Sequence, residues 1–171
     1  MRKTLPRTRS CFVCGRANPL GLNLTFETDG RQVTGRFVPR LEHVGFAETI
    51  HGGLVATVLD EAMVWACGVS AGRFAYCAEL TVRFRHPVRP ATVLEVVGEL
   101  EENRRGRLLL ARAELRDPTG QVLASATGKY IPVPSEAIEP MLADFEGDIR
   151  SLLAPAPPAT AAAASGPEPG S

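Results

Sequence analysis

The sequence predicts an α+β fold in which a long antiparallel β-sheet wraps around one central apolar helix, with an extra helix at the C-terminal side. Three observations support this class. Two segments that alternate apolar and polar residues precede a dense apolar block, Leu54 to Ala66, and four more follow it. Turn residues separate the alternating segments. An amphipathic segment closes the series, an order typical of α+β domains.

The first two strands are expected to form a hairpin. Leu20 to Thr28 and Gln32 to Val38 alternate apolar and polar residues on either side of Asp29-Gly30. This dipeptide is typical of tight hairpin turns, because both residues tolerate a positive φ. Residues 40–50 have neither a helical nor a strand period, and we expect a loop there.

The apolar block that follows His51-Gly52-Gly53 predicts a helix over residues 54–66. Gly68 and Gly72 are expected to terminate this helix. On a helical wheel its apolar side chains point in nearly every direction, as expected of a buried helix. Four strands should follow, at 76–86, 92–100, 107–116 and 121–133. Residues 135–153 begin with a possible N-cap, Ser135, and predict an amphipathic helix.

Length and composition are those of one domain with a full core. The chain has 171 residues, of which 44% are hydrophobic, and its 19 basic residues balance 19 acidic ones. A domain of about 150 residues buries roughly 70% of its unfolded surface and needs no disulfide or metal to be stable. Zero net charge argues against nucleic acid and membrane surfaces as partners, because both favour a basic excess.

The sequence indicates a soluble, cytoplasmic protein. No apolar run approaches the ~18–20 residues of a membrane-spanning helix. The basic start, residues 1–10, runs into polar residues without the hydrophobic stretch of a signal peptide. Four cysteines in a chain with a full core do not resemble a disulfide framework.

The folded domain is expected to span residues 11–153, after a flexible N-terminus over residues 1–10. Residues 154–171 hold one charged side chain, Glu168, and no large apolar one. Such a segment cannot bury enough surface to offset its ordering entropy. Five prolines also interrupt any Ala-rich helix there. We therefore expect a disordered Ala/Pro-rich tail.

Three polar side chains share one sector of the apolar helix. With Asp60 at zero, Thr57 falls at ~60° and Glu61 at ~100°. Two carboxylates on a buried helix are unfavourable unless they are paired or solvated in a cleft. One interpretation is a catalytic carboxylate in a pocket, with its pKa raised by burial or by its neighbour. The other is the solvated side of a surface helix.

The start of the same helix suits an oxyanion. Gly52 and Gly53 leave backbone N–H groups open to close approach, at the end where the helix dipole places ~+0.5 charge. His51 could serve as a base or ligand, but a histidine there more often orients its neighbours. Gly52 and Asp60 lie ~12 Å apart along the helix, too far to act on one carbonyl carbon. If both act, they meet across an oligomer interface.

His51-Gly52-Gly53 followed by Asp60-Glu61 resembles the hotdog-fold acyl-CoA thioesterases, especially their phenylacetate-degradation branch. The leader Cys11-Phe12-Val13-Cys14-Gly15, then Asn18-Pro19-Leu20-Gly21-Leu22, is similar to one in other members of this superfamily. The resemblance covers about residues 11–133. It implies a hotdog fold, a homodimer or homotetramer, and an active site at the dimer interface.

The resemblance also implies roles for individual residues. Gly52 would donate its amide to the thioester carbonyl, while Asp60 of the other chain would act as nucleophile or as general base for water. Glu61 is the alternative acid. Relatives with a polar residue at position 45 or 64 differ from this chain, which has Gly45 and Val64. The alternative function is therefore a non-catalytic protein that binds an acyl thioester of CoA or of a carrier protein. No cofactor is expected.

Two further groups have a functional and a structural interpretation. A basic stripe could hold the phosphates of coenzyme A, or consist of solvated arginines: Arg83, Arg85, His86 and Arg89. Three aromatic residues could line an acyl pocket, or belong to the core: Trp65, Phe74 and Tyr76.

The Cys11-x-x-Cys14 motif could be half of a zinc site or a redox pair. Zinc takes four ligands, and the remaining cysteines, Cys67 and Cys77, lie on the predicted helix and strand. A thioredoxin-like role would need a βαβ context. His43 or a partner chain could complete a metal site. We favour a structural N-terminal turn and expect no metal.

Overall fold

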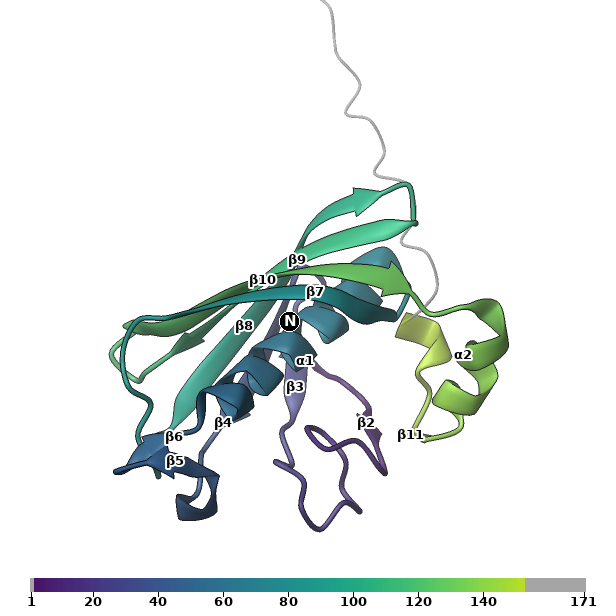
Figure 1. Cartoon of the computed structure of the whole chain (residues 1–171). Helices are drawn as coiled ribbons and strands as arrows, with labels where there is room; N and C mark the ends of the chain where they lie inside the picture. Colours follow the sequence, from purple (N-terminus) through teal and green to yellow (C-terminus); the bar gives the residue numbers. More distant parts are fainter. Residues whose placement is uncertain (1, 153–171) are drawn as a thin grey trace, which may run out of the picture.

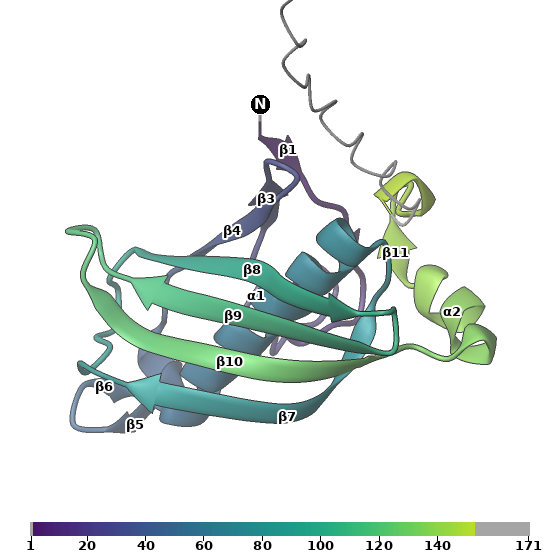
Figure 2. The ribbon, with the colours of Figure 1, turned by 90° about the horizontal axis from the view of Figure 1, so that it is seen from above.

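The computed structural model describes residues 2–152. Leu153 and the predicted tail over residues 154–171 lie outside the described residues. A long antiparallel sheet lies over the central helix α1 (Gly52–Ala71), and α2 (Ser135–Leu142) lies beside them (Figure 1; Figure 2). The predicted fold class is confirmed.

The main sheet has the strand order β1-β3-β4-β8-β9-β10-β7, with antiparallel neighbours throughout. Its strands are β1 (Lys3–Thr4), β3 (Phe26–Thr28), β4 (Gln32–Phe37), β7 (Ala75–Phe84), β8 (Leu94–Arg104), β9 (Leu108–Arg116) and β10 (Val122–Pro132). The four strands predicted after the helix are therefore confirmed. β7 pairs with β10 on one side and forms one edge of this sheet.

The hairpin predicted around Asp29-Gly30 is confirmed as β3 and β4. Asp29 Oδ1 accepts the backbone N–H groups of Arg31 and Gln32, and Gly30 has a φ of 96°. Its first strand begins at Phe26 rather than at Leu20. The preceding residues pair elsewhere, because Leu22 and Leu24 donate backbone hydrogen bonds to the carbonyl groups of Phe12 and Val13.

Residues 3–8 differ from the flexible N-terminus expected from the sequence. β1 pairs with β3, and β2 (Arg7–Thr8) pairs with β11 (Phe145–Glu146). Leu5, between the two strands, is buried in the core. Strands of two residues are too short to produce an alternating pattern, so the sequence gives no indication of them.

Helix α1 is longer than predicted at both ends. It stops at Gly72, whose φ of 66° is the left-handed conformation that commonly ends helices. Its 20 residues are long and apolar enough to cross a membrane by length and composition. The expectation that no segment approaches this length is therefore wrong. The buried residues along α1 show that it packs as the core helix of the described domain.

The contact between α1 and the sheet is closest at Gly98 of β8. A Cβ at this position would lie 2.5 Å from the backbone oxygen of Ala62. Glycine is therefore the residue type that allows the helix backbone to rest directly on the strand.

The expected loop over residues 40–50 is wrong in part. The chain forms a short 3₁₀ helix, η1 (Leu41–His43), and then a hairpin of β5 (Val44–Phe46) and β6 (Thr49–Ile50). Ala47 and Glu48 occupy its turn with φ of 35° and 62°. These residue types are unusual in such turns, which explains why the sequence does not reveal the hairpin.

The C-terminal helix is shorter than predicted. α2 ends at Leu142, and the chain continues as β11 and the 3₁₀ helix η2 (Arg150–Leu152). Pro134 rather than Ser135 precedes the helix as its N-cap residue. Pro140 lies inside α2 and lacks the N–H group that would donate to the carbonyl of Glu136, which weakens the helix near its end.

Candidate functional site

The N-terminus of α1 forms part of the wall of a cavity of about 590 Å³. The wall comes from the β5–β6 hairpin, the start of α1, the end of β7 and the loop that follows it. Its lining includes Gly45, Phe46, His51, Gly52, Phe84 and Arg85. The cavity therefore lies at the positive end of the helix dipole.

The backbone N–H groups of Gly52 and Gly53 differ in their availability. His51 is the N-cap residue, and its Nδ1 accepts the N–H of Gly53 at 2.9 Å. Within residues 2–152, the N–H of Gly52 has no hydrogen-bond acceptor. The cap therefore occupies the Gly53 amide, which the sequence analysis also considered as an oxyanion donor, and leaves the Gly52 amide free.

Asp60 lies two turns further along α1 and contacts the sheet. Its Oδ1 accepts a hydrogen bond from the hydroxyl of Tyr130, on β10, at 2.7 Å. Tyr130 is fully buried, whereas Asp60 is half-buried. Burial raises the pKa of Tyr130 far above its ordinary value, and the adjacent Asp60 raises it further. The phenol therefore stays protonated and continues to donate to Asp60.

Sequence reasoning missed Tyr130. It lies in a predicted strand, in a chain with only two tyrosines. A tyrosine whose ring faces a core usually needs a hydrogen-bond partner for its hydroxyl, and this could have prompted a search for one.

Glu61 faces the N-terminal segment instead of the sheet. Its Oε1 and Oε2 lie 3.8 and 3.9 Å from the Sγ of Cys11. Burial raises the pKa of Glu61 to about 7, and the nearby Cys11 contributes in the same direction. Two carboxylates that are adjacent in sequence therefore have different surroundings, one beside a phenol and the other beside a thiol.

Asp60 and Glu61 share a second cavity, of about 270 Å³, with Trp65, Phe74 and Tyr76. Trp65 and Phe74 are buried and pack edge to face at 5.3 Å, whereas Tyr76 is 57% exposed. Trp65 and Phe74 therefore belong to the core, and all three aromatic residues line this cavity. Gly52 and Asp60 of one chain lie on different cavities.

The remaining predicted site residues are dispersed. Thr57 Oγ1 donates to the Gly53 carbonyl at 2.8 Å, within the helix, and Thr57 lines neither cavity. Arg85 lines the Gly52 cavity, but Arg83 does not. Arg89 lies 3.5 and 3.4 Å from backbone carbonyl oxygens in the β5–β6 turn and so buttresses that hairpin. Of the predicted basic stripe, Arg85 and His86 therefore line the Gly52 cavity, whereas Arg83 and Arg89 do not.

Cys11, Cys14 and Glu61 lie together, with one ligand atom from each within 4.8 Å of the others. His43, which the sequence analysis considered as a further ligand, is engaged elsewhere. Its Nδ1 accepts the backbone N–H of Arg40 at 3.1 Å. Cys67 is buried within α1 and Cys77 is exposed on β7, so neither joins this group.

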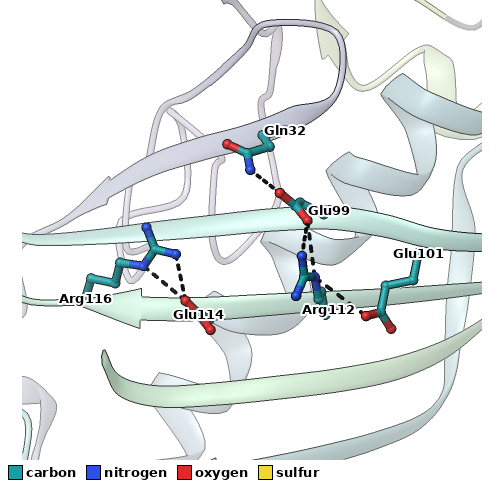
Figure 3. Close-up of polar contacts among 6 residues, drawn as sticks. All are labelled: Gln32, Glu99, Glu101, Arg112, Glu114 and Arg116. Atoms are coloured by element: carbon teal, nitrogen blue, oxygen red, sulfur yellow. Dashed lines mark hydrogen bonds and ion pairs between the residues drawn. The ribbon is translucent and has the colours of Figure 1, made fainter. Parts of the chain in front are cut away.

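The face of the sheet turned away from α1 is charged (Figure 3). Arg112 Nη2 lies 2.6 Å from Glu99, and its Nε lies 3.6 Å from Glu101. Arg116 and Glu114 form a further pair at 2.7 Å, and Gln32 donates to Glu99. Surface pairs of this kind contribute little to stability. The apolar candidate site therefore lies on the helix side of the sheet.

Comparison with known proteins gives three informative structures. Residues 47–124 match the family model of the thioesterase superfamily. The thioesterase superfamily protein RHA08564 is 26% identical, over 72% of this chain and 60% of its own length, with a TM-score of 0.66. The PaaI protein of the Escherichia coli phenylacetic acid degradation operon is 16% identical, with a TM-score of 0.60. The match covers 66% of this chain and 81% of PaaI. The Streptococcus mutans protein smu.793, bound to acetyl-CoA, is 15% identical, with a TM-score of 0.60. The match covers 65% of this chain and 89% of smu.793. No curated protein matches the chain.

The region that matches the family model contains part of the candidate site, whereas Tyr130 follows it. The chain spans 60% of the length of RHA08564. Because PaaI and smu.793 are only 16% and 15% identical to this chain, their similarity establishes the fold and nothing more. The matched region holds Gly52, Asp60 and the edge strand β7, whereas Cys11 and Cys14 precede it. This chain is thus a hotdog-fold protein whose residues 47–124 match the thioesterase superfamily.

Proposed function

We propose that this chain hydrolyses an acyl-CoA thioester. The observation that carries the proposal is the N–H of Gly52, which has no acceptor within residues 2–152 and belongs to the wall of a 590 Å³ cavity at the start of an apolar helix. A thioester carbonyl placed there would accept this N–H, and the negative charge of the tetrahedral intermediate would develop at the positive end of the helix. One such donor is worth about 10²–10³ in turnover.

Asp60 is the proposed nucleophile or general base. Its carboxylate borders a cavity and is held by Tyr130, whereas Glu61 faces Cys11. A carboxylate fixed by a permanent donor is well placed to take a proton from water or to attack the carbonyl carbon itself. Glu61 is therefore not the acid in this proposal.

The edge strand β7 provides a way to bring Gly52 and Asp60 together. Phe84, at one end of β7, lies beside Gly52, and Cys77, near the other end, lines the cavity of Asp60. Two copies joined by a two-fold axis near the middle of β7 would pair antiparallel. The Gly52 end of one copy would then lie beside the Asp60 end of the other. We propose this homodimer, alone or within a tetramer, as the active form.

In this proposal each of the two cavities binds a different part of the substrate. Arg85 and His86 line the Gly52 cavity and are suited to the phosphate groups of coenzyme A. The second copy would supply its smaller cavity, lined by Trp65, Phe74 and Tyr76, for the acyl group. A volume of about 270 Å³ with aromatic walls favours short or aromatic acyl groups, which agrees with the proposed likeness to the phenylacetate-degradation branch.

The test is thiol release from short, aromatic and long-chain acyl-CoAs by the wild type, Gly52→Pro and Gly52→Ala. Proline removes the N–H but fits the first helical position, and His51, with φ −58° and ψ 128°, already has the conformation favoured before proline. Alanine keeps the N–H and adds a methyl group 3.3 Å from the exposed ring of Phe84. We expect a loss of at least ~100-fold with proline and a much smaller loss with alanine. Equal rates for the two variants would exclude the oxyanion role.

A second candidate function is binding of an acyl thioester without hydrolysis. Two observations favour this function. Gly45 lines the Gly52 cavity and Val64 lines the Asp60 cavity, and both positions are polar in some relatives. Neither can orient a water molecule through its side chain. Saturable binding of an acyl-CoA by the wild type, with no thiol released from any substrate in the panel, would favour this function over hydrolysis.

A further inference from the structure

The N-terminal segment and helix α1 together form a cluster of three ligand-type side chains. Cys11 and Cys14 belong to the segment, and Glu61 lies about 50 residues later on α1. Their ligand atoms all lie within 4.8 Å of one another. The proposed hydrolysis gives none of the three a chemical role, although Cys14 and Glu61 line the cavity proposed for the acyl group.

The backbone holds the two sulfur atoms on one side of a tight turn. Val13 donates its backbone N–H to the Sγ of Cys11 at 3.2 Å, and Gly15 donates to the carbonyl of Cys11 at 2.9 Å. A Cβ at Gly15 would lie 2.3 Å from that carbonyl oxygen, so the turn requires glycine. Arg7 Nε also donates to the carbonyl of Cys14 at 3.0 Å. The turn is therefore fixed independently of any ligand.

The cluster lacks a balancing positive charge. Among residues 2–152, Glu61 forms no ion pair with any lysine, arginine or histidine. Its polar neighbours are the thiols of Cys11 and Cys14, the indole of Trp65 and the carboxylate of Asp60, none of which carries a positive charge. A desolvated carboxylate without a positive partner is unfavourable unless a proton or a cation accompanies it. Two thiolates and a carboxylate are a ligand set that binds divalent zinc.

We propose that Cys11, Cys14 and Glu61 bind one Zn²⁺ ion and thereby tie the N-terminal segment to helix α1. The two distances from Cys11 Sγ to the Glu61 carboxylate oxygens, 3.8 and 3.9 Å, are close to the ~3.5 Å between sulfur and oxygen ligands of a tetrahedral zinc ion. Cys11 and Glu61 therefore need only a small contraction, and the Cys14 sulfur lies within 4.8 Å of both. Cys14 and Glu61 line the 270 Å³ cavity, from which water can reach the fourth position.

Zinc would displace the thiol protons of Cys11 and Cys14 and leave both sulfur atoms reduced. No oxidant or reductant takes part. The competing arrangement is a disulfide between the same two cysteines, which would remove two of the three ligands and exclude zinc.

The experiment measures metal content and affinity in the full-length chain, purified under reducing conditions without chelators. We expect about one zinc per chain, and we expect Co²⁺ added to the metal-free chain to give the thiolate-to-cobalt charge-transfer and tetrahedral d–d absorption bands. Cys11→Ser, Cys14→Ser and Glu61→Gln should each weaken binding at least ~10-fold.

Two variants serve as matched controls. Asp60→Asn neutralises the neighbouring carboxylate, and Cys77→Ser removes the exposed thiol of β7. Both should keep the zinc. If a cysteine variant fails to fold, Glu61→Gln still tests the ligand set, because it preserves the shape of the side chain.

Three outcomes would overturn the proposal: a metal-free chain that binds neither Zn²⁺ nor Co²⁺, equal affinities for Glu61→Gln and Asp60→Asn, or wild-type zinc affinity in both Cys11→Ser and Cys14→Ser. None of them depends on thioesterase activity, so failure of this proposal and failure of the proposed function are separate results.

Discussion

Replacing Tyr130 with phenylalanine removes one hydrogen bond and keeps the buried ring. The hydroxyl donates to Asp60 Oδ1 at 2.7 Å, and hydrogen bonds to charged groups contribute about 1.5–3 kcal/mol. Asp60 is half-buried, so water can replace part of the lost interaction, and we expect the lower end of this range. At about 2–4 °C per kcal/mol for a chain of this size, the melting temperature of Tyr130→Phe should fall by roughly 3–6 °C.

The same variant should reduce turnover more than it weakens substrate binding. Tyr130 is a positioning residue in this account, because it fixes the carboxylate that acts. A misplacement of about 1 Å can reduce turnover ~100-fold, so we expect kcat to fall by ~10- to 100-fold with little change in KM. The assay compares kcat, KM and melting temperature of Tyr130→Phe with those of the wild type.

Tyr76→Phe is the matched control, because it removes the chain's other tyrosine hydroxyl, whose ring is 57% exposed. It should leave the melting temperature unchanged. Wild-type kcat and melting temperature in Tyr130→Phe would show that this hydroxyl does not hold the Asp60 carboxylate in place.

Three further predictions concern the scaffold. Gly98→Ala should lower the free energy of unfolding by at least ~1–3 kcal/mol in urea titrations, because its Cβ would lie 2.5 Å from the Ala62 oxygen; unchanged stability would contradict the close packing of α1 on β8. Ser70→Ala should raise that free energy by ~0.5–1.5 kcal/mol, because the buried Ser70 Oγ has no partner within the described residues and alanine favours the helix; a loss of stability would reveal a partner. Burial lowers the pKa of His43, so the unfolded chain binds more protons below pH ~6.5. Stability should therefore decline as the pH falls below ~6.5, down to the lowered folded pKa, and His43→Gln should remove this part of the decline in melting curves; the same slope in both proteins would contradict it.

The longer strands and the central helix of the fold could be predicted from the sequence. The strands β7 to β10 each have at least nine residues, which is enough to show an alternating pattern. The β3–β4 hairpin could be predicted because Asp29-Gly30 is a residue pair typical of hairpin turns. The two-residue strands β1 and β2 are too short to show an alternating pattern. The Ala47-Glu48 turn is formed by residues that rarely adopt a positive φ, so its hairpin depends on tertiary context.

The candidate site could be predicted only in part. The polar sector of α1 and the glycines at its start are local features that a helical wheel reveals. The contact of Asp60 with Tyr130 joins residues 70 positions apart, and that of Glu61 with Cys11 joins residues 50 apart. Such pairings depend on how the strands and segments pack around the helix. The same holds for Gly53, whose amide is occupied because of the orientation of the His51 ring.

In the proposed active form, the amide of Gly52 from one copy and the carboxylate of Asp60 from the other act on the same thioester. The most direct measurement mixes Gly52→Pro and Asp60→Asn chains, each inactive alone, by joint unfolding and refolding. Random pairing makes half of the dimers mixed, and each mixed dimer has one of its two sites intact. The account therefore predicts recovery of about a quarter of the wild-type thiol-release activity. No recovery, from a mixture shown to contain mixed dimers, would contradict the shared site.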